Sequence, residues 1–235
     1  MAVAGHERSA VERLPAAGRI RDMHRRIERR LERAGLPAAH ARVVLDANAA
    51  ALAHRMDVLG DDEHPDLLHP SRTLLILLDD CGVVDARVLE AAASVESEHP
   101  ALRIPHRNDL AGSVPLADSE TLLEDLVSVS DDVRSIALAE RLDHARHLHL
   151  RDHRFWPACH EQACSVYRPV AHRSLPRLAR RYDWWCRMFA RRFLGSGSAL
   201  IRTRTPLAGA QTASALLPRI FSACLTAAAR MPREL

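Results

Sequence analysis

Apolar residues recur every three or four positions through most of the chain, a spacing that predicts α-helices with one buried side. The period is clearest in the segments 19–35, 37–56, 131–150, 156–170 and 175–194. No stretch of useful length alternates apolar and polar residues as a half-buried strand does, and no segment is repeated. The hydrophobic pattern therefore predicts an all-α protein.

The segment 66–103 predicts two helices joined by a tight turn. Pro70 suits the first turn of a helix, and Gly82 suits the end of that helix. Asp85 is placed to cap the second helix. If the two helices pack antiparallel, His69 at the start of the first helix meets the residues that follow the second, namely Glu96, Glu98 and His99. These side chains are candidates for metal or phosphate chemistry.

Breaks in the pattern divide the chain into three parts. Residues 1–16 are weakly patterned and are predicted to form a flexible N-terminus, whereas 17–194 is predicted to be one helical domain. A Gly-Ser joint then opens the segment 195–235, which is predicted to hold a linker and a weak C-terminal helix. Within the domain, 57–68 and 100–118 are rich in breakers and are predicted loops.

Three finer expectations concern individual helices. Asp131 or Asp132 is predicted to cap the helix that runs to about Leu150. Pro169 is predicted to break the helix 156–170. The helix 37–56 is predicted to bury an alanine-rich side composed of Val43, Val44, Ala47, Ala50, Ala51 and Ala53.

The composition is that of an ordinary globular protein, with 47% hydrophobic and 27% charged residues over 235 positions. All 33 basic residues are Arg because the sequence has no Lys, which excludes a lysine nucleophile. A net charge of +3 permits an anionic ligand without indicating nucleic acid. The five cysteines lack a disulfide-framework spacing, and no secretory leader or membrane-spanning apolar stretch is visible. We therefore expect a cytoplasmic protein with no membrane partner.

Two segments could each either bind a partner or have only a structural role. The Arg-rich run 19–33 is interrupted by Glu28 and Glu32, which favours a solvated helix face over nucleic-acid binding. The aromatic residues of 175–194 are spaced as a buried stripe. The alternative for that helix is a docking surface for a protein partner, formed by Tyr182, Trp184 and Trp185.

Cys159, His160 and Cys164 suggest a zinc site, because thiolate and imidazole are the ligands of structural zinc. Only Cys186, far along the chain, is available to complete the set. The sequence therefore favours inert, buried thiols on packed helices over a metal site.

Three motifs, in order, resemble the HD-type hydrolase domain of the RelA/SpoT family. The first begins at His69 and reads HPSRTLLILLDDCGVVDARVLEAA, like the helix pair that an HP dipeptide opens in that family. The second, at 138–148, reads LAERLDHARHL and resembles the family's L-A-D-R-L helix. The third and most specific, at 162–173, reads QACSVYRPVAHR and resembles its Y-A-P-L-A-H-R helix. The likeness covers about 42–194 and implies an HD-domain-like helical bundle.

The resemblance implies a manganese-dependent phosphohydrolase that removes the 3′-pyrophosphate of the guanosine alarmone (p)ppGpp. A guanosine nucleotide, or another phosphorylated small molecule, is then the expected partner. Carried over position by position, the likeness makes His69 and Glu140 ligands of Mn²⁺, with Glu96 as a substitute third ligand. Glu98 or His99 would assist the attacking water, and His144 and Arg141 would contact the substrate.

The sequence departs from the family pattern at its centre. The His-Asp pair of the family falls on Ser94-Val95, neither of which replaces an imidazole or a carboxylate ligand. In the family's D-R-L-x-N motif the aspartate is replaced here by Glu140 and the asparagine by His144. The family's Arg-Lys-Ser-Gly substrate loop is absent. The alternative is thus an inactive HD-fold scaffold that binds a nucleotide or a protein and acts as a regulator. In that case His69 packs at a helix start, Glu140 pairs with His144, and the other acids, Glu96 and Glu98, are solvated.

Overall fold

The computed structural model describes residues 16–61, 63–104 and 109–195. Within these ranges the protein is helical and has no strand, so the predicted all-α class is confirmed. The segments predicted to form a flexible N-terminus and a weak C-terminal helix lie, apart from Ala16 and Gly195, outside the described residues. No helix among the described residues is long and apolar enough to span a bilayer.

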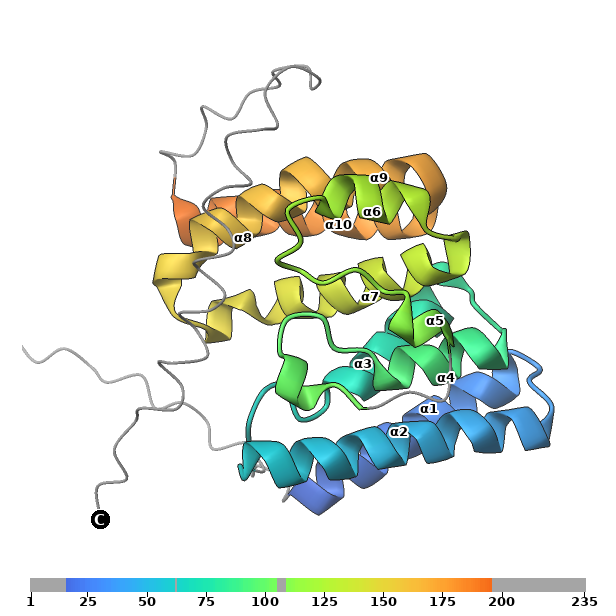
Figure 1. Ribbon diagram of the computed structural model, residues 1–235. Coiled ribbons are helices and arrows are strands. Elements are labelled where there is room, and N and C mark those ends of the chain that lie inside the picture. Colours follow the sequence, from blue (N-terminus) through green and yellow to red (C-terminus); the bar gives the residue numbers. More distant parts are fainter. Residues whose placement is uncertain (1–15, 62, 105–108, 196–235) are drawn as a thin grey trace, which may run out of the picture.

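The helices lie in three groups that run across the molecule (Figure 1). The first group is α1 (Ala16–Arg33) and α2 (Ala38–Leu59). The middle group is α3 (His69–Ile76), α4 (Ala86–Ser94) and α7 (Asp131–His147). On the far side lie α8 (Trp156–Gln162), α9 (Arg168–Ser174) and α10 (Pro176–Phe189). Because α2 packs on α4, α3 on α7, and α10 on both α7 and α9, the middle group is covered on both sides.

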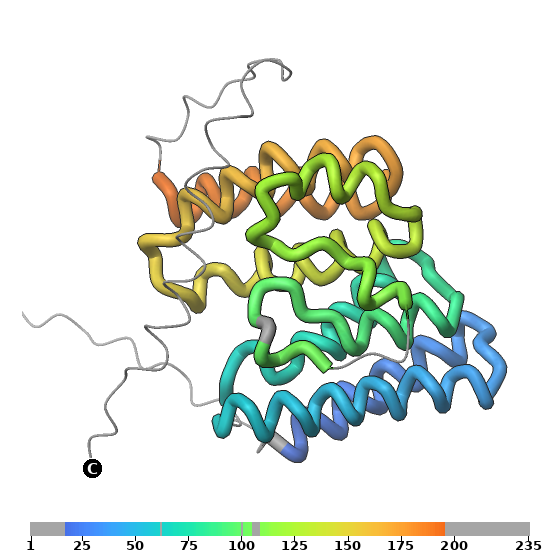
Figure 2. Tube along the Cα trace, in the orientation of Figure 1, coloured from blue at the N-terminus to red at the C-terminus, as the bar shows by residue number. Residues whose placement is uncertain are grey.

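Shorter pieces connect these helices. Wider π-helical turns follow three of them: Leu77–Cys81 (η1), Ala163–Tyr167 (η5) and Ala190–Leu194 (η6). Single 3₁₀ turns lie at Pro100–Leu102 (η2), Leu148–Leu150 (η3) and His153–Phe155 (η4). The chain after α4 crosses the front of the bundle through the short helices α5 (Asp109–Gly112) and α6 (Leu122–Ser128) before α7 begins (Figure 2).

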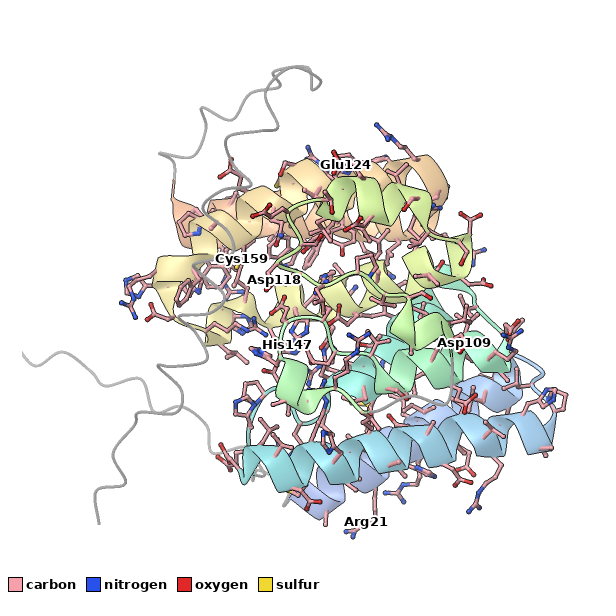
Figure 3. All side chains as sticks on the ribbon, in the orientation of Figure 1. Arg21, Asp109, Asp118, Glu124, His147 and Cys159 are labelled. Carbon is pink, nitrogen blue, oxygen red and sulfur yellow. The ribbon has the colours of Figure 1, made fainter. Side chains whose placement is uncertain are left out.

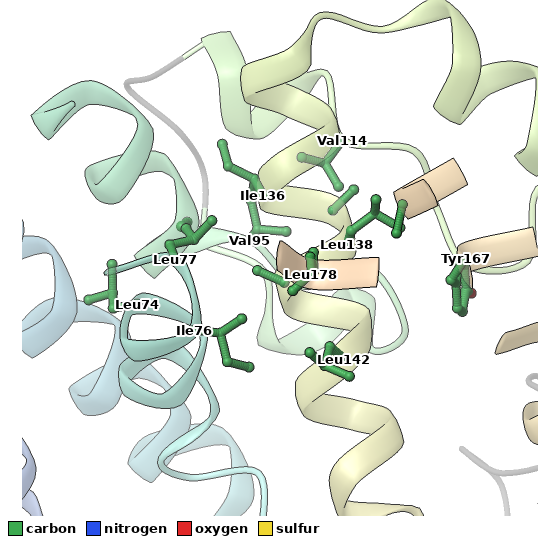
Figure 4. Packing of buried hydrophobic residues seen from close by; sticks show 14 of the residues in the cluster. Leu74, Ile76, Leu77, Val95, Val114, Ile136, Leu138, Leu142, Tyr167 and Leu178 are labelled. Carbon is green, nitrogen blue, oxygen red and sulfur yellow. The ribbon is translucent and has the colours of Figure 1, made fainter. Parts of the chain in front are cut away.

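One apolar core joins the three groups. One cluster of buried side chains contains Leu74 of α3, Leu77 of η1, Ile136 and Leu138 of α7, and Leu178 of α10 (Figure 4). These five side chains are fully buried. Burying each leucine or isoleucine stabilises the fold by roughly 1.5–3 kcal/mol, so the core fixes the relative positions of α3, α7 and α10.

Local chemistry sets the ends of the first helix pair as the sequence predicted. Pro70 stands in the first turn of α3, and Gly82 adopts the left-handed conformation (φ 73°) that ends the turn after it. The side chain of Asp85 accepts a hydrogen bond from the backbone N–H of Arg87 and caps α4. His69 therefore starts the first helix, and the chain leaves α4 beside it.

Two finer expectations were wrong. Ser130, and not Asp131 or Asp132, caps α7, because its hydroxyl accepts from the backbone N–H of Val133. Pro169 does not break the helix, since the wider π-helical turn before it leaves room for the proline ring in the first turn of α9.

The second helix also differs from its prediction. α2 continues through Leu59, so the predicted loop at 57–68 begins only at Gly60, whose left-handed backbone ends the helix. Val43 is 45% exposed and Ala50 and Ala53 are exposed too, because α2 faces the bundle on one narrow side only. The buried apolar positions on that side are Val44, Leu45, Ala51 and Leu52.

The aromatic stripe of α10 is a core feature. Tyr182, Trp185 and Phe189 are buried, and the hydroxyl of Tyr182 donates to the backbone carbonyl of Leu138 in α7 (2.8 Å). Trp184 alone of the three proposed docking residues is exposed. A docking surface that uses Tyr182 and Trp185 is therefore wrong.

Candidate metal centre

Four buried side chains from three parts of the chain meet in the middle group. They are His69 at the start of α3, Glu96 after α4, and Glu140 and His144 of α7. One nitrogen or oxygen atom of each lies within 4.8 Å of the corresponding atoms of the others. Glu140 and His144 share a face of α7 because they are four residues apart. The three residues expected to bind metal thus lie together, and His144, expected to contact substrate, lies with them.

The orientation of His69 is fixed by a carboxylate on its outer side. Its Nδ1 lies 2.8 Å from Oδ2 of Asp143, whose other oxygen accepts from Nε of Arg72 (2.9 Å). Although burial opposes it, this pairing with His69 and Arg72 holds the pKa of Asp143 well below its usual range. Burial lowers the pKa of His69, so its ring is neutral and donates Nδ1–H to Asp143. The lone pair is then on Nε2, which points toward the cluster.

Nε2 of His69 is buried and has no hydrogen-bond partner among the residues that the structure describes. Oε1 of Glu140 lies 3.9 Å from it, and the ring of His69 stacks on that of His144. An unsatisfied buried polar atom costs about 1–3 kcal/mol. A neutral imidazole held by a carboxylate, with its other nitrogen aimed into a cluster of acids, is the usual arrangement of a metal-binding histidine.

Glu96 is held from both sides. Oε2 accepts from Nη2 of Arg55 (2.5 Å), while Oε1 accepts from the backbone N–H groups of Glu98 (2.9 Å) and His99 (3.1 Å). Burial raises the pKa of Glu96, but His144 and Arg55 outweigh it and lower the pKa well below normal. The carboxylate is therefore ionised and buried, which contradicts the alternative that Glu96 is solvated.

Glu140 is oriented by Ser97 and Arg141. Its Oε1 accepts from the backbone N–H of Ser97 (3.1 Å), and the Ser97 hydroxyl contacts both carboxylate oxygens (2.5 Å). Nη1 of Arg141 lies 3.3 Å from Oε2. Burial raises the pKa of Glu140, but the charge of Arg141 and the hydrogen bond from His144 outweigh it and lower the pKa.

His144 carries a proton on the side that faces the cluster. Burial lowers its pKa, but the charges of Glu98 and Glu96 outweigh this and raise it well above normal, which favours the imidazolium. Nη2 of Arg151 lies 2.8 Å from Nδ1 and favours instead the neutral form protonated at Nε2. In both forms Nε2–H donates to Oε1 of Glu140 (3.1 Å).

The remaining predicted residues lie around the cluster. Glu98 pairs with Nη1 of Arg151, and Nε2 of His99 lies 4.0 Å from Asp66. Arg141 is almost fully buried, and its guanidinium contacts Ser97, Glu140 and the backbone carbonyl of Pro115. A cavity of about 20 Å³, room for roughly one water molecule, lies beside Glu98, Arg141, His144 and Arg151.

Sequence reasoning missed the partners that orient the four central residues, namely Arg55, Ser97 and Asp143. Asp143 carries the one signal that was available, because it lies three residues after Glu140 and so near the same helix face. His147, labelled in Figure 3, is the last residue of α7 and marks the end of the helix that is nearer to this cluster of residues.

The four residues fit a divalent cation of intermediate softness. Two imidazoles and two carboxylates suit Mn²⁺, Fe²⁺ or Zn²⁺. Nε2 of His69, which is buried without a hydrogen-bond partner among the described residues, is the atom best placed to bind the cation. To bind through Nε2, His144 must give up the proton that it now donates to Glu140.

Comparison with known proteins identifies no relative. No protein-family model, no curated protein and no solved structure matches the chain.

Proposed function

We propose that this protein is a metal-dependent phosphohydrolase whose substrate is a small phosphorylated molecule. The single observation that carries the proposal is the buried, unpartnered Nε2 of His69 beside two ionised carboxylates. The resemblance to the RelA/SpoT hydrolase domain narrows the substrate class to guanosine polyphosphates and the cation to Mn²⁺. Glu96 and His144 would take the places that the lost His-Asp pair leaves open.

The protein would hold the cation with His69, Glu96, Glu140 and His144. When bound, such a cation lowers the pKa of a coordinated water and polarises a phosphoryl group. Asp143, Arg55 and Ser97 keep the ligand atoms of His69, Glu96 and Glu140 pointing inward.

Proton transfer and charge stabilisation would fall to residues at the edge of the cluster. Burial lowers the pKa of His99, so its half-buried imidazole is neutral near pH 7 and can accept a proton from an attacking water. Arg151 lies over Glu98 and His144 and is 21% exposed, so it can meet a phosphate from the solvent side. Glu98 keeps Arg151 in place.

The experiment measures hydrolysis of (p)ppGpp by protein that is stripped of metal and then supplied with Mn²⁺. The assay monitors the release of pyrophosphate. We expect activity that depends on Mn²⁺ and that falls by at least about 100-fold in His69→Ala and in Glu140→Gln. Arg25→Ala removes an exposed arginine of α1 and should leave the activity unchanged. Wild-type protein that neither binds Mn²⁺ nor releases pyrophosphate would refute the proposal.

One observation favours a second function, an inactive scaffold that binds a nucleotide or a protein partner. Arg55 already balances the charge of Glu96, and Arg141 that of Glu140. Nε2–H of His144 also donates a hydrogen bond to Glu140. Under this function, guanosine nucleotide binds without metal, and His69→Ala binds it as tightly as the wild type. Titration calorimetry in the presence of a chelator separates the two functions.

A further inference from the structure

A second cluster of metal-ligating side chains lies away from the candidate centre, between α8 and α10. His160 of α8 and Cys164 of η5 are four residues apart and lie on one side of a continuous helix. Cys186 of α10 meets them, and one ligand atom of each of the three lies within 4.8 Å of the others. Neither cysteine is in a disulfide. The sequence favoured inert, buried thiols here; the fold brings Cys186, 26 positions after His160, next to both residues.

The protonation of His160 is set by its neighbour. Nε2 lies 2.9 Å from the backbone carbonyl of Cys186, and a carbonyl only accepts, so Nε2 carries the hydrogen. In the neutral ring the lone pair is then on Nδ1, and Sγ of Cys164 lies 3.9 Å from Nδ1 and 3.6 Å from Nε2. The ring lies beside the rings of Phe189 and Trp185, at 6.0 Å and 5.7 Å between ring centres. A metal-binding histidine is prepared in this way when its second nitrogen donates to a backbone carbonyl.

We propose that His160, Cys164 and Cys186 form a binding site for Zn²⁺, with two thiolates and one imidazole as ligands. Two thiolates balance the charge of the ion, and sulfur with nitrogen is the set that selects zinc over manganese or magnesium. Zinc–sulfur bonds of about 2.3 Å and zinc–nitrogen bonds of about 2.0 Å place tetrahedral ligand atoms about 3.5–3.8 Å apart. The observed spacing, 3.9 Å between Cys164 and His160 and at most 4.8 Å within the set, needs a contraction of about 1 Å.

The ion would add coordinate bonds between two elements that are now joined by packing and by the hydrogen bond from His160 to the backbone of Cys186. α8 and η5 would be linked to α10, which also carries the aromatic stripe of the core. Cys164 is half-buried, so its side of the site is open to a water as fourth ligand. Because zinc would bind the folded protein and not the unfolded chain, its binding adds to the stability of this side of the bundle. The site does not depend on the proposed phosphohydrolase function, since the two clusters share no residue.

The test is a titration of reduced, metal-free protein with Co²⁺ and then with Zn²⁺, followed by absorption in the near ultraviolet. Cobalt bound by thiolates gives an intense charge-transfer band, whereas cobalt bound by the imidazoles and carboxylates of the other cluster does not. We expect one equivalent of Co²⁺ to produce the band and Zn²⁺ to abolish it by displacement. Thermal unfolding should shift upward with added Zn²⁺.

Variants assign the band to its ligands. Cys164→Ser, Cys186→Ser and His160→Gln should each weaken Zn²⁺ binding by more than about 100-fold, beyond the 10–100-fold cost of losing an outer partner. Cys81→Ser removes a half-buried thiol of η1 and is the matched control, which should bind like the wild type. The wild-type spectrum needs no variant, so a variant that fails to fold leaves the test intact. A missing band, equal binding by Cys164→Ser and Cys81→Ser, or a Cys164–Cys186 disulfide in protein purified with zinc would each overturn the proposal.

Discussion

Replacing Arg55 with Met tests how the centre holds its charge. Arg55 lies in α2 and is 1% exposed, and its side chain makes two buried hydrogen bonds. Nη2 donates to Glu96 (2.5 Å), and Nη1 donates to the backbone carbonyl of Asp66 (2.9 Å). Met keeps much of the aliphatic stem, so Arg55→Met removes the charge and the donors and leaves most of the packing in place.

The expected loss is about 3–5 kcal/mol in the free energy of unfolding, measured without metal. Removing one partner of a buried ion pair leaves an uncompensated charge, which costs that amount. Glu96 cannot turn to solvent, because it is 1% exposed and its other oxygen is held by two backbone N–H groups. The second change Glu96→Gln removes the stranded charge, so the double variant should recover at least about 1 kcal/mol relative to the sum of the single changes.

Equilibrium unfolding in urea, with chelator present, gives the four free energies of this cycle. Arg42→Met is the control, since Arg42 pairs with Asp46 on the surface, where both side chains are mostly exposed, and should cost less than about 1 kcal/mol. A loss below about 1 kcal/mol for Arg55→Met, or additive single changes within about 0.5 kcal/mol, would refute the reasoning.

The same variant distinguishes the two functions. If the four central residues bind a cation, saturating Mn²⁺ supplies the positive charge that Arg55→Met removes, and the loss should shrink by more than about 1 kcal/mol. If the protein is a scaffold without metal, Mn²⁺ leaves the loss unchanged. Repeating the cycle with Mn²⁺ in place of the chelator measures the difference.

The parts of the fold that could be predicted depend on short-range chemistry. The period of apolar residues gave α1, α7 and α10 because a helix face repeats within a few residues. Pro70, Gly82 and Asp85 end or start their helices through backbone properties of the residue itself. The errors lie where tertiary context decided between neighbours, as in the choice of cap between Ser130 and the two following aspartates.

The candidate centre was half predictable for a related reason. Glu140 and His144 share a helix face, and antiparallel packing of the first helix pair brings Glu96 toward His69, so two pairs within the cluster follow from helix geometry. Arg55 and Glu96 are 41 positions apart. Such contacts leave no periodic signal, so the residues that orient the ligands could not be found from the sequence. The sequence favoured inert thiols over a metal site at His160 and Cys164 for the same reason, because the distance of Cys186 along the chain gave no sign that it lies beside them.

Two further predictions concern local interactions. Ser130→Ala should lower the free energy of unfolding by about 1 kcal/mol, because α7 loses the hydroxyl that caps it; a urea titration that shows no change would contradict this. Glu98 gives a pH dependence: burial raises its pKa, but Arg151 and His144 outweigh this and lower it to about 2, from 4.5. A folded-state pKa below the unfolded value adds stability above about pH 4.5 and loses it as the pH falls toward 2, and the shift corresponds to on the order of 3 kcal/mol. The wild type should therefore lose stability between pH 5 and 2 more steeply than Glu98→Gln, whose amide does not titrate. Thermal unfolding of the metal-free proteins across that range measures the two slopes, and equal slopes would mean that the carboxylate of Glu98 gains nothing from Arg151 in the folded protein.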